Sequence, residues 1–244
     1  YEELGKRFLA SHPADKKPGA VFAWYSAAAA TASKKFTKAE SLYEVATQLD
    51  PVFRKGYYYA MYSAYFYRDN EEDAMRFAVA YAMIAPKEFS DIVRSVPDDQ
   101  RDPITQLIKY LAKKALDNRM ASACRELNHV LAGILDTTNA WNNYAFMARE
   151  SGKYGESEKA YRHALEIQPT SGQLMNDLGV ILHFHKGTPE AWQEAEKLYI
   201  KAGKAAQRVL QDTSSSAADR ETAQTTKRDA NSNLRDLRKL MKRR

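Results

Sequence analysis

Residues 138–171, TNAWNNYAFMARESGKYGESEKAYRHALEIQPTS, decide how the rest of the chain is interpreted. Apolar residues recur there at helical spacing on both sides of Gly152, which supplies a turn, and Pro169 ends the second run. The residues that define the pattern followed below are, in chain order, Trp141, Tyr144, Ala145, Gly152, Tyr154, Tyr161, Ala164, Leu165 and Pro169. Because Ala164 is small, bulky residues of the first helix can pack closely against the second. The stretch therefore predicts a pair of antiparallel helices.

The same register of small, aromatic and proline positions recurs along the chain. The predicted units are 20–53, 55–88, a degenerate 104–137, 138–171 and 172–209. The last unit matches only if about one helical turn is inserted near Thr188–Trp192. The degenerate unit lacks the glycine, and we expect its turn at Asp117-Asn118, because asparagine tolerates the left-handed conformation.

Four further segments lie outside these units. Residues 1–19 predict a leading helix, at Glu2–His12, and a linker, and residues 89–103 form an insertion with an exposed loop at Pro97–Pro103. A break at Asp212–Ser216 precedes a last helix within 216–244, which Ser216 can cap. That helix is apolar only near its end, so we expect its last turns to pack and its start to be solvated.

This pattern resembles the tetratricopeptide repeat (TPR), in which each unit of about 34 residues forms two antiparallel helices. The resemblance covers residues 20–209. It implies an all-α fold, an α-solenoid of helix pairs in a TPR-like superhelix, with the last helix as a C-terminal cap. It also implies a non-enzymatic scaffold or adaptor that holds a protein or peptide segment in a concave groove, possibly within a larger complex.

In TPR proteins certain positions of each first helix face the concave groove, so the resemblance indicates which side chains meet a partner. The aromatic half of the groove would contain Trp24, Tyr59 and Phe66, and the polar half Asn142, Asn143, Arg149, Asn176 and Asp177. Side-chain amides both donate and accept hydrogen bonds, which suits the backbone of an extended segment. The carboxylate-clamp subfamily needs several basic groove residues, and only Arg149 and Lys109 are available, so we argue against it.

An aromatic run on the second unit has two interpretations. It consists of Tyr57, Tyr58, Tyr59, Tyr62, Tyr65, Phe66 and Tyr67, which places rings on every side of a helix. The rings can serve packing between helices, with hydroxyls at the rim. They can also form a surface that grips a partner, because tyrosine is enriched at binding hot spots.

The net charge of +6 lies entirely in the C-terminal residues 227–244, which hold eight basic and two acidic side chains. The tail residues proposed for an acidic partner are Arg235, Arg238, Lys239, Lys242 and Arg243. They can simply solubilise the end of a helix, or they can bind an acidic protein, a nucleic acid or an anionic lipid.

Sites for catalysis, metals or cofactors are not predicted. His183 and His185 are two residues apart and point to different sides of a helix, and Cys124 sits within an apolar helical pattern. Lys186-Gly187-Thr188 lacks the glycines that a phosphate loop needs. Carboxylates are scattered as helix pairs with lysine, which is typical of a solvated face.

Composition limits the class of protein and leaves the compartment open. The chain is 44% hydrophobic, and no apolar run approaches the ~20 residues that span a bilayer. Its single cysteine excludes an intrachain disulfide and favours a reducing, cytoplasmic compartment, although exported helical proteins can also lack disulfides. Because the chain starts at Tyr1, we expect a processed form or a fragment whose targeting segment, if it has one, lies outside it.

Three hypotheses for the function follow. The leading one is the groove-binding scaffold. The first alternative is a nucleic-acid-associated protein that uses the basic tail, although the groove lacks charge and no one-base-per-repeat code is visible. The second alternative is the regulatory TPR domain of a larger enzyme, with the catalytic residues outside this chain.

Overall fold

A computed structural model describes residues 18–243, and in this range the chain forms twelve α-helices and no strand. The helices are α2 (Pro18–Ala32), α3 (Phe36–Leu49), α4 (Gly56–Arg68), α5 (Glu71–Ile84), α6 (Pro86–Ser95), α7 (Asp98–Asp117), α8 (Ala121–Leu135), α9 (Thr138–Glu150), α10 (Tyr154–Ile167), α11 (Gly172–Val180), α12 (Pro189–Gln211) and α13 (Ala217–Lys242). Two short segments are also helical, the 3₁₀ turn η1 (Pro51–Phe53) and the π-helix η2 (Ile181–Lys186). The all-α fold is confirmed, and the expected leading helix at Glu2–His12 lies outside the described residues.

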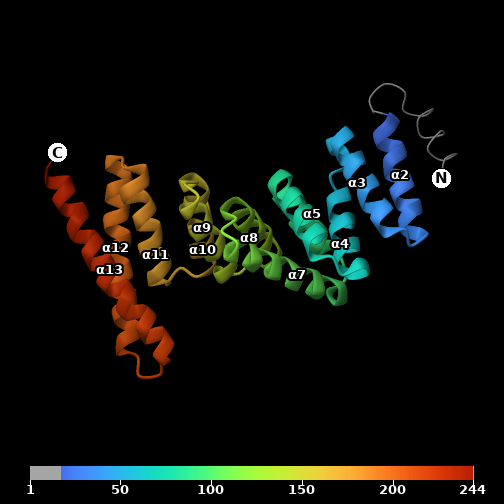
Figure 1. The fold of residues 1–244 in the computed structure, drawn as a ribbon. Coiled ribbons are helices and arrows are strands. Elements are labelled where there is room, and N and C mark those ends of the chain that lie inside the picture. Colours follow the sequence, from blue (N-terminus) through green and yellow to red (C-terminus); the bar gives the residue numbers. More distant parts are fainter. Residues whose placement is uncertain (1–17, 244) are drawn as a thin grey trace. The chain divides into compact units, whose positions relative to one another are not determined.

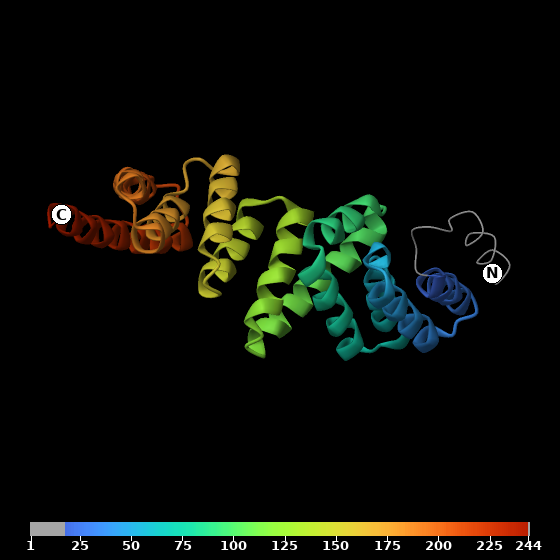
Figure 2. The same ribbon diagram turned by 90° about the horizontal axis from the view of Figure 1, so that it is seen from above.

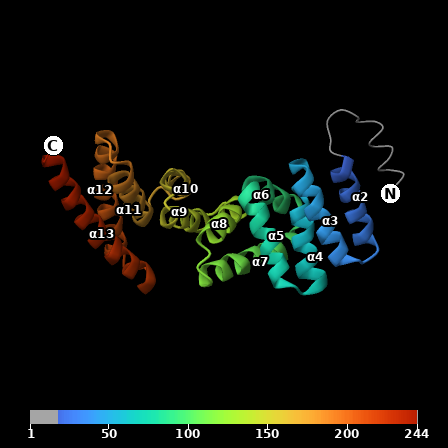
Figure 3. The ribbon, with the colours of Figure 1, turned by 45° about the horizontal axis from the view of Figure 1, so that its top comes forward.

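Two compact units divide the chain between Ile134 and Leu135. Within unit 1, helices that follow one another in sequence pack on one another from α2 to α7, as Figure 3 shows for α2 to α6. In unit 2 the same holds from α9 to α13 (Figure 1). Each unit is therefore a stack of consecutive antiparallel helices, which is the solenoid arrangement that the repeat predicts.

Alanines occupy the helix crossings of unit 1. Ala39, Ala46, Ala64 and Ala78 have no solvent-exposed surface. A methyl side chain lets two helix backbones approach closely, while larger side chains fill the space between successive pairs. Ala46 takes the place in its unit that Ala164 takes in residues 138–171, and both are buried.

Residues 98–103 are helical, so the loop predicted at Pro97–Pro103 is wrong, although the segment is mostly exposed as expected. Helix α6 (Pro86–Ser95) buries Phe89, and α7 continues through Pro103. The acidic pair Asp98-Asp99 begins α7, where negative charge suits the positive end of the helix dipole. Pro103 lies close to that start and removes a single backbone donor from the ladder, a cost that the buried residues further along α7 offset.

The turn between α7 and α8 falls where the sequence predicts, but another residue takes the left-handed conformation. Asn118 has a φ of −87°, whereas Arg119 has a φ of 58°. The backbone N–H of Met120 donates to the carbonyl of Ala115 across this turn at 2.8 Å. The chain reverses one residue later than predicted, so Arg119 and not Asn118 has the left-handed conformation.

Helices α9 and α10 form the pair that residues 138–171 predict, and they lie side by side (Figures 1 and 2). Gly152 has a φ of 70°, a left-handed conformation that glycine adopts without strain. Tyr161 and Ala164 have no exposed surface, and the Ser157 hydroxyl donates to the carbonyl of Ala145 at 2.8 Å. This hydrogen bond ties the two helices together at the buried crossing.

The residues predicted as an extra turn near Thr188–Trp192 do not form a separate turn. They lengthen the two helices of this pair, which are joined by a short connection. The first helix continues through η2 to Lys186, and Thr188 caps α12. Tyr199 packs against Gly179, where an added Cβ would lie 2.6 Å from the tyrosine ring. Only glycine permits this approach of α11 to the ring, so the pair keeps its crossing despite the added residues.

Helix α13 covers α11 and α12. Ser216 caps it as predicted, its hydroxyl accepting from the backbone N–H of Asp219 at 3.1 Å. Its first residues, 217–222, are mostly exposed, as expected of a solvated start. Its buried face begins at Ala223 and continues through Thr226, Ala230 and Leu237, so packing extends beyond the last turns to which the sequence prediction limits it. Small residues bury the middle of α13 by close approach, which a count of leucines does not reveal.

Candidate functional site

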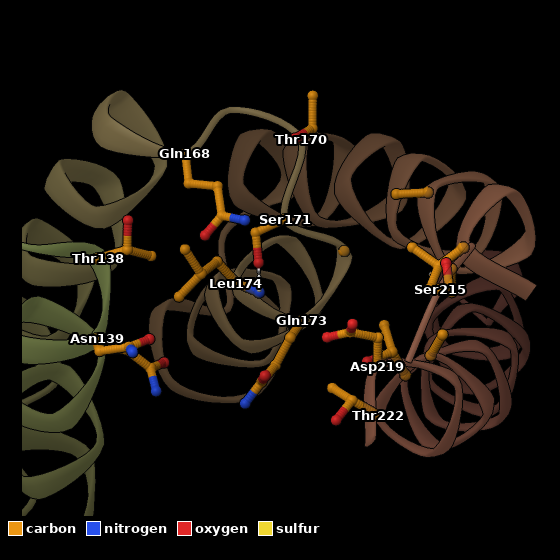
Figure 4. Close-up of a pocket in the computed structure, with 17 residues that line it drawn as sticks. Thr138, Asn139, Gln168, Thr170, Ser171, Gln173, Leu174, Ser215, Asp219 and Thr222 are labelled. Atoms are coloured by element: carbon orange, nitrogen blue, oxygen red, sulfur yellow. Dashed lines mark hydrogen bonds between the residues drawn. The ribbon is translucent and has the colours of Figure 1, made fainter. Parts of the chain in front are cut away.

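Two adjoining hollows in unit 2 form a groove along α9, α11 and α13, called here the unit-2 groove. Their volumes are about 500 Å³ and about 370 Å³, and both linings include Gln173, Thr222 and Thr226. Figure 4 shows the larger hollow, with Asn139 of α9, Gln173 of α11 and Thr222 of α13 around it. The end of α12 and the connection from α10 to α11 complete its wall.

Three of the five residues predicted for the polar half lie in this groove. Asn142 lines the larger hollow, and Asn176 and Asp177 line the smaller one. Asn143 is exposed and lines neither hollow. Arg149 lines neither as well, because its guanidinium lies 4.8 Å from the ring of Phe146 and its Nε is 3.1 Å from Glu150.

Asn142 has an unused acceptor. Its Oδ1 atom is buried and has no hydrogen-bond partner within the described protein. Leaving a buried acceptor unpaired typically costs about 1 to 3 kcal/mol, so most such atoms in folded proteins have a partner.

Asn176 is already used within the fold. It is only 8% exposed, its Nδ2 donates to Asp177 at 3.2 Å, and its Oδ1 accepts from Asn233 of α13 at 3.1 Å. The amide therefore holds α13 against α11. It is a poor donor or acceptor for a partner, in contrast to the role predicted from the sequence.

Helix α13 supplies a wall of the groove that the sequence reasoning missed. This wall includes Asp219, Glu221, Thr222, Thr226 and Asp229. The available signal is the spacing of Ala223, Thr226 and Ala230, which puts small residues on one helical face and predicts close packing. That packing turns the polar residues between them toward α11.

The charged side chains that line the groove are all acidic. They are Asp177 on α11 and Asp219, Glu221 and Asp229 on α13. Burial raises the pKa of the Asp177 carboxyl above its ordinary value, and the Asp229 carboxylate acts in the same direction. The hydrogen bond from Asn176 and the charge of Arg149 act the opposite way. The groove thus combines amides, hydroxyls and carboxylates, a surface rich in acceptors.

A sequence profile described as "Tetratricopeptide repeat" matches residues 138–171, which form α9 and α10 beside this groove. Residues 138–171 of this chain are therefore a tetratricopeptide repeat. The profile covers one unit, and the other predicted units rest on the recurring register of the sequence and on the consecutive helix pairs of the fold. The TPR fold implies the general role of a protein-interaction scaffold. No curated protein matches the chain by sequence.

Several solved TPR-like structures are similar to this chain at low identity. YrrB, described as a TPR protein with an unusual peptide-binding site, is 14% identical over 82% of this chain and 91% of its own, with a TM-score of 0.37. MamA is 13% identical over 80% and 96%, with a TM-score of 0.40. The TPR2AB domain of yeast Sti1, in complex with pHSP90, is 11% identical over 94% and 90%, with a TM-score of 0.42. Similarity this low carries no information on what the chain binds.

The aromatic residues predicted for the TPR groove in unit 1 form a partly exposed cluster. Trp24 packs against Tyr43, Phe53 and Tyr59, with ring centroids 5.3 to 5.8 Å apart. Tyr59 is 44% exposed. Phe66 joins this cluster through Tyr62, whose ring centroid is 4.6 Å away, and Tyr58, whose ring contacts those of Tyr62 and Tyr59.

The packing interpretation of the aromatic run applies to only part of it. Tyr57 and Tyr58 are buried between helices, and burial raises the pKa of Tyr58 to about 12. Tyr59, Phe66 and Tyr67 are exposed. Packing therefore accounts for one side of α4, and the exposed rings on its other side stay a predicted contact surface.

The basic residues predicted at the C-terminal end of the TPR array lie on the exposed side of α13. Arg238 reaches Glu196 of α12 at 2.6 Å, and Lys239 lies 3.3 Å from Asp236. Arg235, Lys242 and Arg243 are exposed. Both ion pairs are largely open to solvent, so they contribute little to stability.

Other reactive side chains are accounted for by the TPR core. Burial raises the pKa of the Cys124 thiol, which suits a buried structural cysteine. Burial lowers the pKa of His183, whose Nδ1 lies 3.4 Å from the hydroxyl of Tyr199. Within residues 18–243, no three His, Cys, Asp or Glu side chains gather as metal ligands, and no helix has the length and apolar character to cross a bilayer.

Proposed function

We propose that this protein is a non-enzymatic scaffold that binds an extended segment of a partner protein in the unit-2 groove. The observation that carries the proposal is the buried, unpaired Oδ1 of Asn142 in a hollow of about 500 Å³. Asn139 and Gln173 flank it from α9 and α11. The general scaffold role of the TPR fold points the same way.

An extended segment matches the chemistry of this surface. Its backbone presents donors and acceptors at short intervals, and side-chain amides can pair with both kinds of group. Asn142 offers an acceptor that has no competing partner in the free protein. Binding would therefore satisfy a buried atom of the scaffold as well as the backbone of the ligand.

A photo-crosslinking experiment tests this proposal. A photoreactive phenylalanine derivative is placed at Gln173, which is exposed and lines both hollows. The control position is Lys159, which is exposed on α10 and lines neither hollow. We expect a partner segment that crosslinks only from position 173, and a synthetic copy of it should bind the chain directly. Equal crosslinking from both positions would contradict groove binding.

A second candidate function is binding of a phosphate backbone by the exposed side of α13. It is favoured by Arg235 and Lys242, which are exposed and have no ion-pair partner among residues 18–243. Binding to duplex DNA should weaken steeply as salt rises, because phosphate contacts release counterions. A charge-reversed variant at Arg235 and Lys242 should show a shallower salt dependence in a fluorescence-anisotropy titration. An unchanged slope would exclude this surface.

A further inference from the structure

The lining of the unit-2 groove shows which kind of segment it suits. Four carboxylates line the two hollows, and no Lys, Arg or His does so. They come from two elements packed against each other: Asp177 from α11 and Asp219, Glu221 and Asp229 from α13. A bound segment therefore meets negative charge from two sides.

Nearby basic groups neutralise only part of this charge. The Nε of Arg228 lies 3.0 Å from Asp229, and this pair is largely exposed. Arg149 acts on Asp177 from a distance, while its own Nε is occupied by Glu150. Asp219 accepts from the hydroxyl of Ser216 at 2.6 Å, which leaves its charge in place. The groove keeps a net negative field.

The unpaired atom of the groove agrees with this charge. Asn142 Oδ1 is an acceptor, as are all the carboxylate oxygens, so the lining has more places for donors than for acceptors. Lysine and arginine are the side chains that bring several donors together with positive charge. The unpaired Asn142 acceptor and the carboxylates therefore both favour a ligand group that donates hydrogen bonds and is positively charged.

We propose that the unit-2 groove selects protein segments that carry lysine or arginine, with a basic side chain seated between Asp177 and Asp229. This inference rests on the proposed groove function and adds the chemical class of the partner.

A peptide library tests the inference on the intact chain. Random 12-residue peptides displayed on phage are selected against it, and the enriched sequences are synthesised with a fluorescent label. Each peptide is also made with every lysine and arginine replaced by glutamine. Groove binding is judged separately by Gln173→Trp, because a bulky ring at this exposed lining position fills the hollow.

Affinities are then measured on two matched charge variants by fluorescence anisotropy. Asp177→Asn/Asp229→Asn removes two groove carboxylates with nearly unchanged shape. Glu166→Gln/Asp236→Asn removes two exposed carboxylates that line neither hollow. We expect enriched peptides to be basic, to lose about tenfold or more in affinity on the first variant, and to bind the second like the parent.

The outcomes separate the inference from the proposed function. Peptides that depend on Gln173 but are not basic, or that bind Asp177→Asn/Asp229→Asn normally, overturn the inference and leave groove binding intact. If Gln173→Trp weakens no selected peptide, groove binding itself fails and the inference fails with it. Sedimentation would show whether the chain self-associates. If it does, and only the groove variant abolishes this, the groove ligand is the basic helix of a second copy, which overturns the inference of a separate partner protein.

Discussion

Replacing Asn142 should affect the stability of the protein and its affinity for a ligand in different ways. Asn142→Ala removes an acceptor that has no partner in the free protein and introduces the best helix former. We expect the free energy of unfolding to stay level or to rise by about 1 kcal/mol. Affinity for the groove ligand should fall by about 0.5 to 1.5 kcal/mol, because one hydrogen bond is lost.

Urea denaturation and a binding titration on the same preparation measure both quantities. Asn143→Ala is the matched control, since Asn143 is the neighbouring amide and lines neither hollow. A drop in stability for Asn142→Ala would mean that the amide is paired inside the fold after all. Asn176→Ala is unsuitable as a probe, because it would also break the bond to Asn233.

His183 should make the fold sensitive to mild acid. It is 4% exposed, and burial lowers its pKa, opposed by the Asp236 carboxylate. The unfolded chain therefore takes up the proton more readily than the folded one. Stability from this residue is complete above the ordinary histidine pKa of ~6.5, and it is lost as the pH falls through the lower pKa of the folded state.

Unfolding of the parent and of His183→Gln is compared at pH 7.5 and pH 5. The loss of stability between the two pH values should be smaller for the variant. Packing damage from the substitution affects both pH values alike, so it cancels in this difference. An equal loss in both proteins would assign the acid sensitivity to other groups.

The burial of a residue could be predicted where the residue occupies a repeat position. Its hydrogen-bond partner could not be predicted where that partner lies on a helix distant in sequence. Ala164 and Ala46 follow from their places in the register, and both are fully buried. The hydrogen bond between Asn176 and Asn233 does not follow, because the repeat ends before α13 and gives that helix no register. Asn142 lines a hollow of unit 2, but its unpaired Oδ1 could be found only in the packed structure.

Among the helices, α13 combines a structural face and a charged face that should respond to mutation in opposite ways. Leu237 has no exposed surface, so Leu237→Ala should cost about 2 to 5 kcal/mol. Charge reversal at Arg235 and Lys242 should change stability by less than about 0.5 kcal/mol, because both are exposed. Thermal denaturation of the two variants checks this contrast. A similar loss in both would mean that the charged face also packs.

Helices α7 and α13 show why element boundaries were harder to predict than the repeat itself. Proline and acidic residues at 97–103 are typical of loops, but they are equally typical of a helix start, and the buried face of α7 decides between the two. In α13, the apolar pattern is carried by alanine and threonine. Those small residues stabilise the helix because they allow close packing against a neighbouring helix. A sequence alone does not show which helix is the neighbour.

At the scale of the whole molecule, a solenoid distributes stability along the chain. Each repeat contacts mainly its sequence neighbours, so the effect of a core substitution should fade with distance along the sequence. Ala46 and Ala164 are equivalent positions in different units, and both lack exposed surface. They offer a matched pair of substitutions for testing this property.

Ala46→Leu and Ala164→Leu should each overpack one helix crossing and cost about 1 to 3 kcal/mol. Native-state hydrogen exchange with mass spectrometry locates the loss. Ala46→Leu should lower protection in α2 to α5 and leave α9 to α13 like the parent, and Ala164→Leu should do the reverse. Lys159→Leu, on the exposed side of α10, controls for added apolar surface. Loss of protection spread evenly over the chain after either substitution would show that it unfolds as one cooperative block. In that case Ala46→Leu, far from the groove in sequence, should also weaken ligand binding near denaturing conditions, whereas a repeat-wise chain should bind normally.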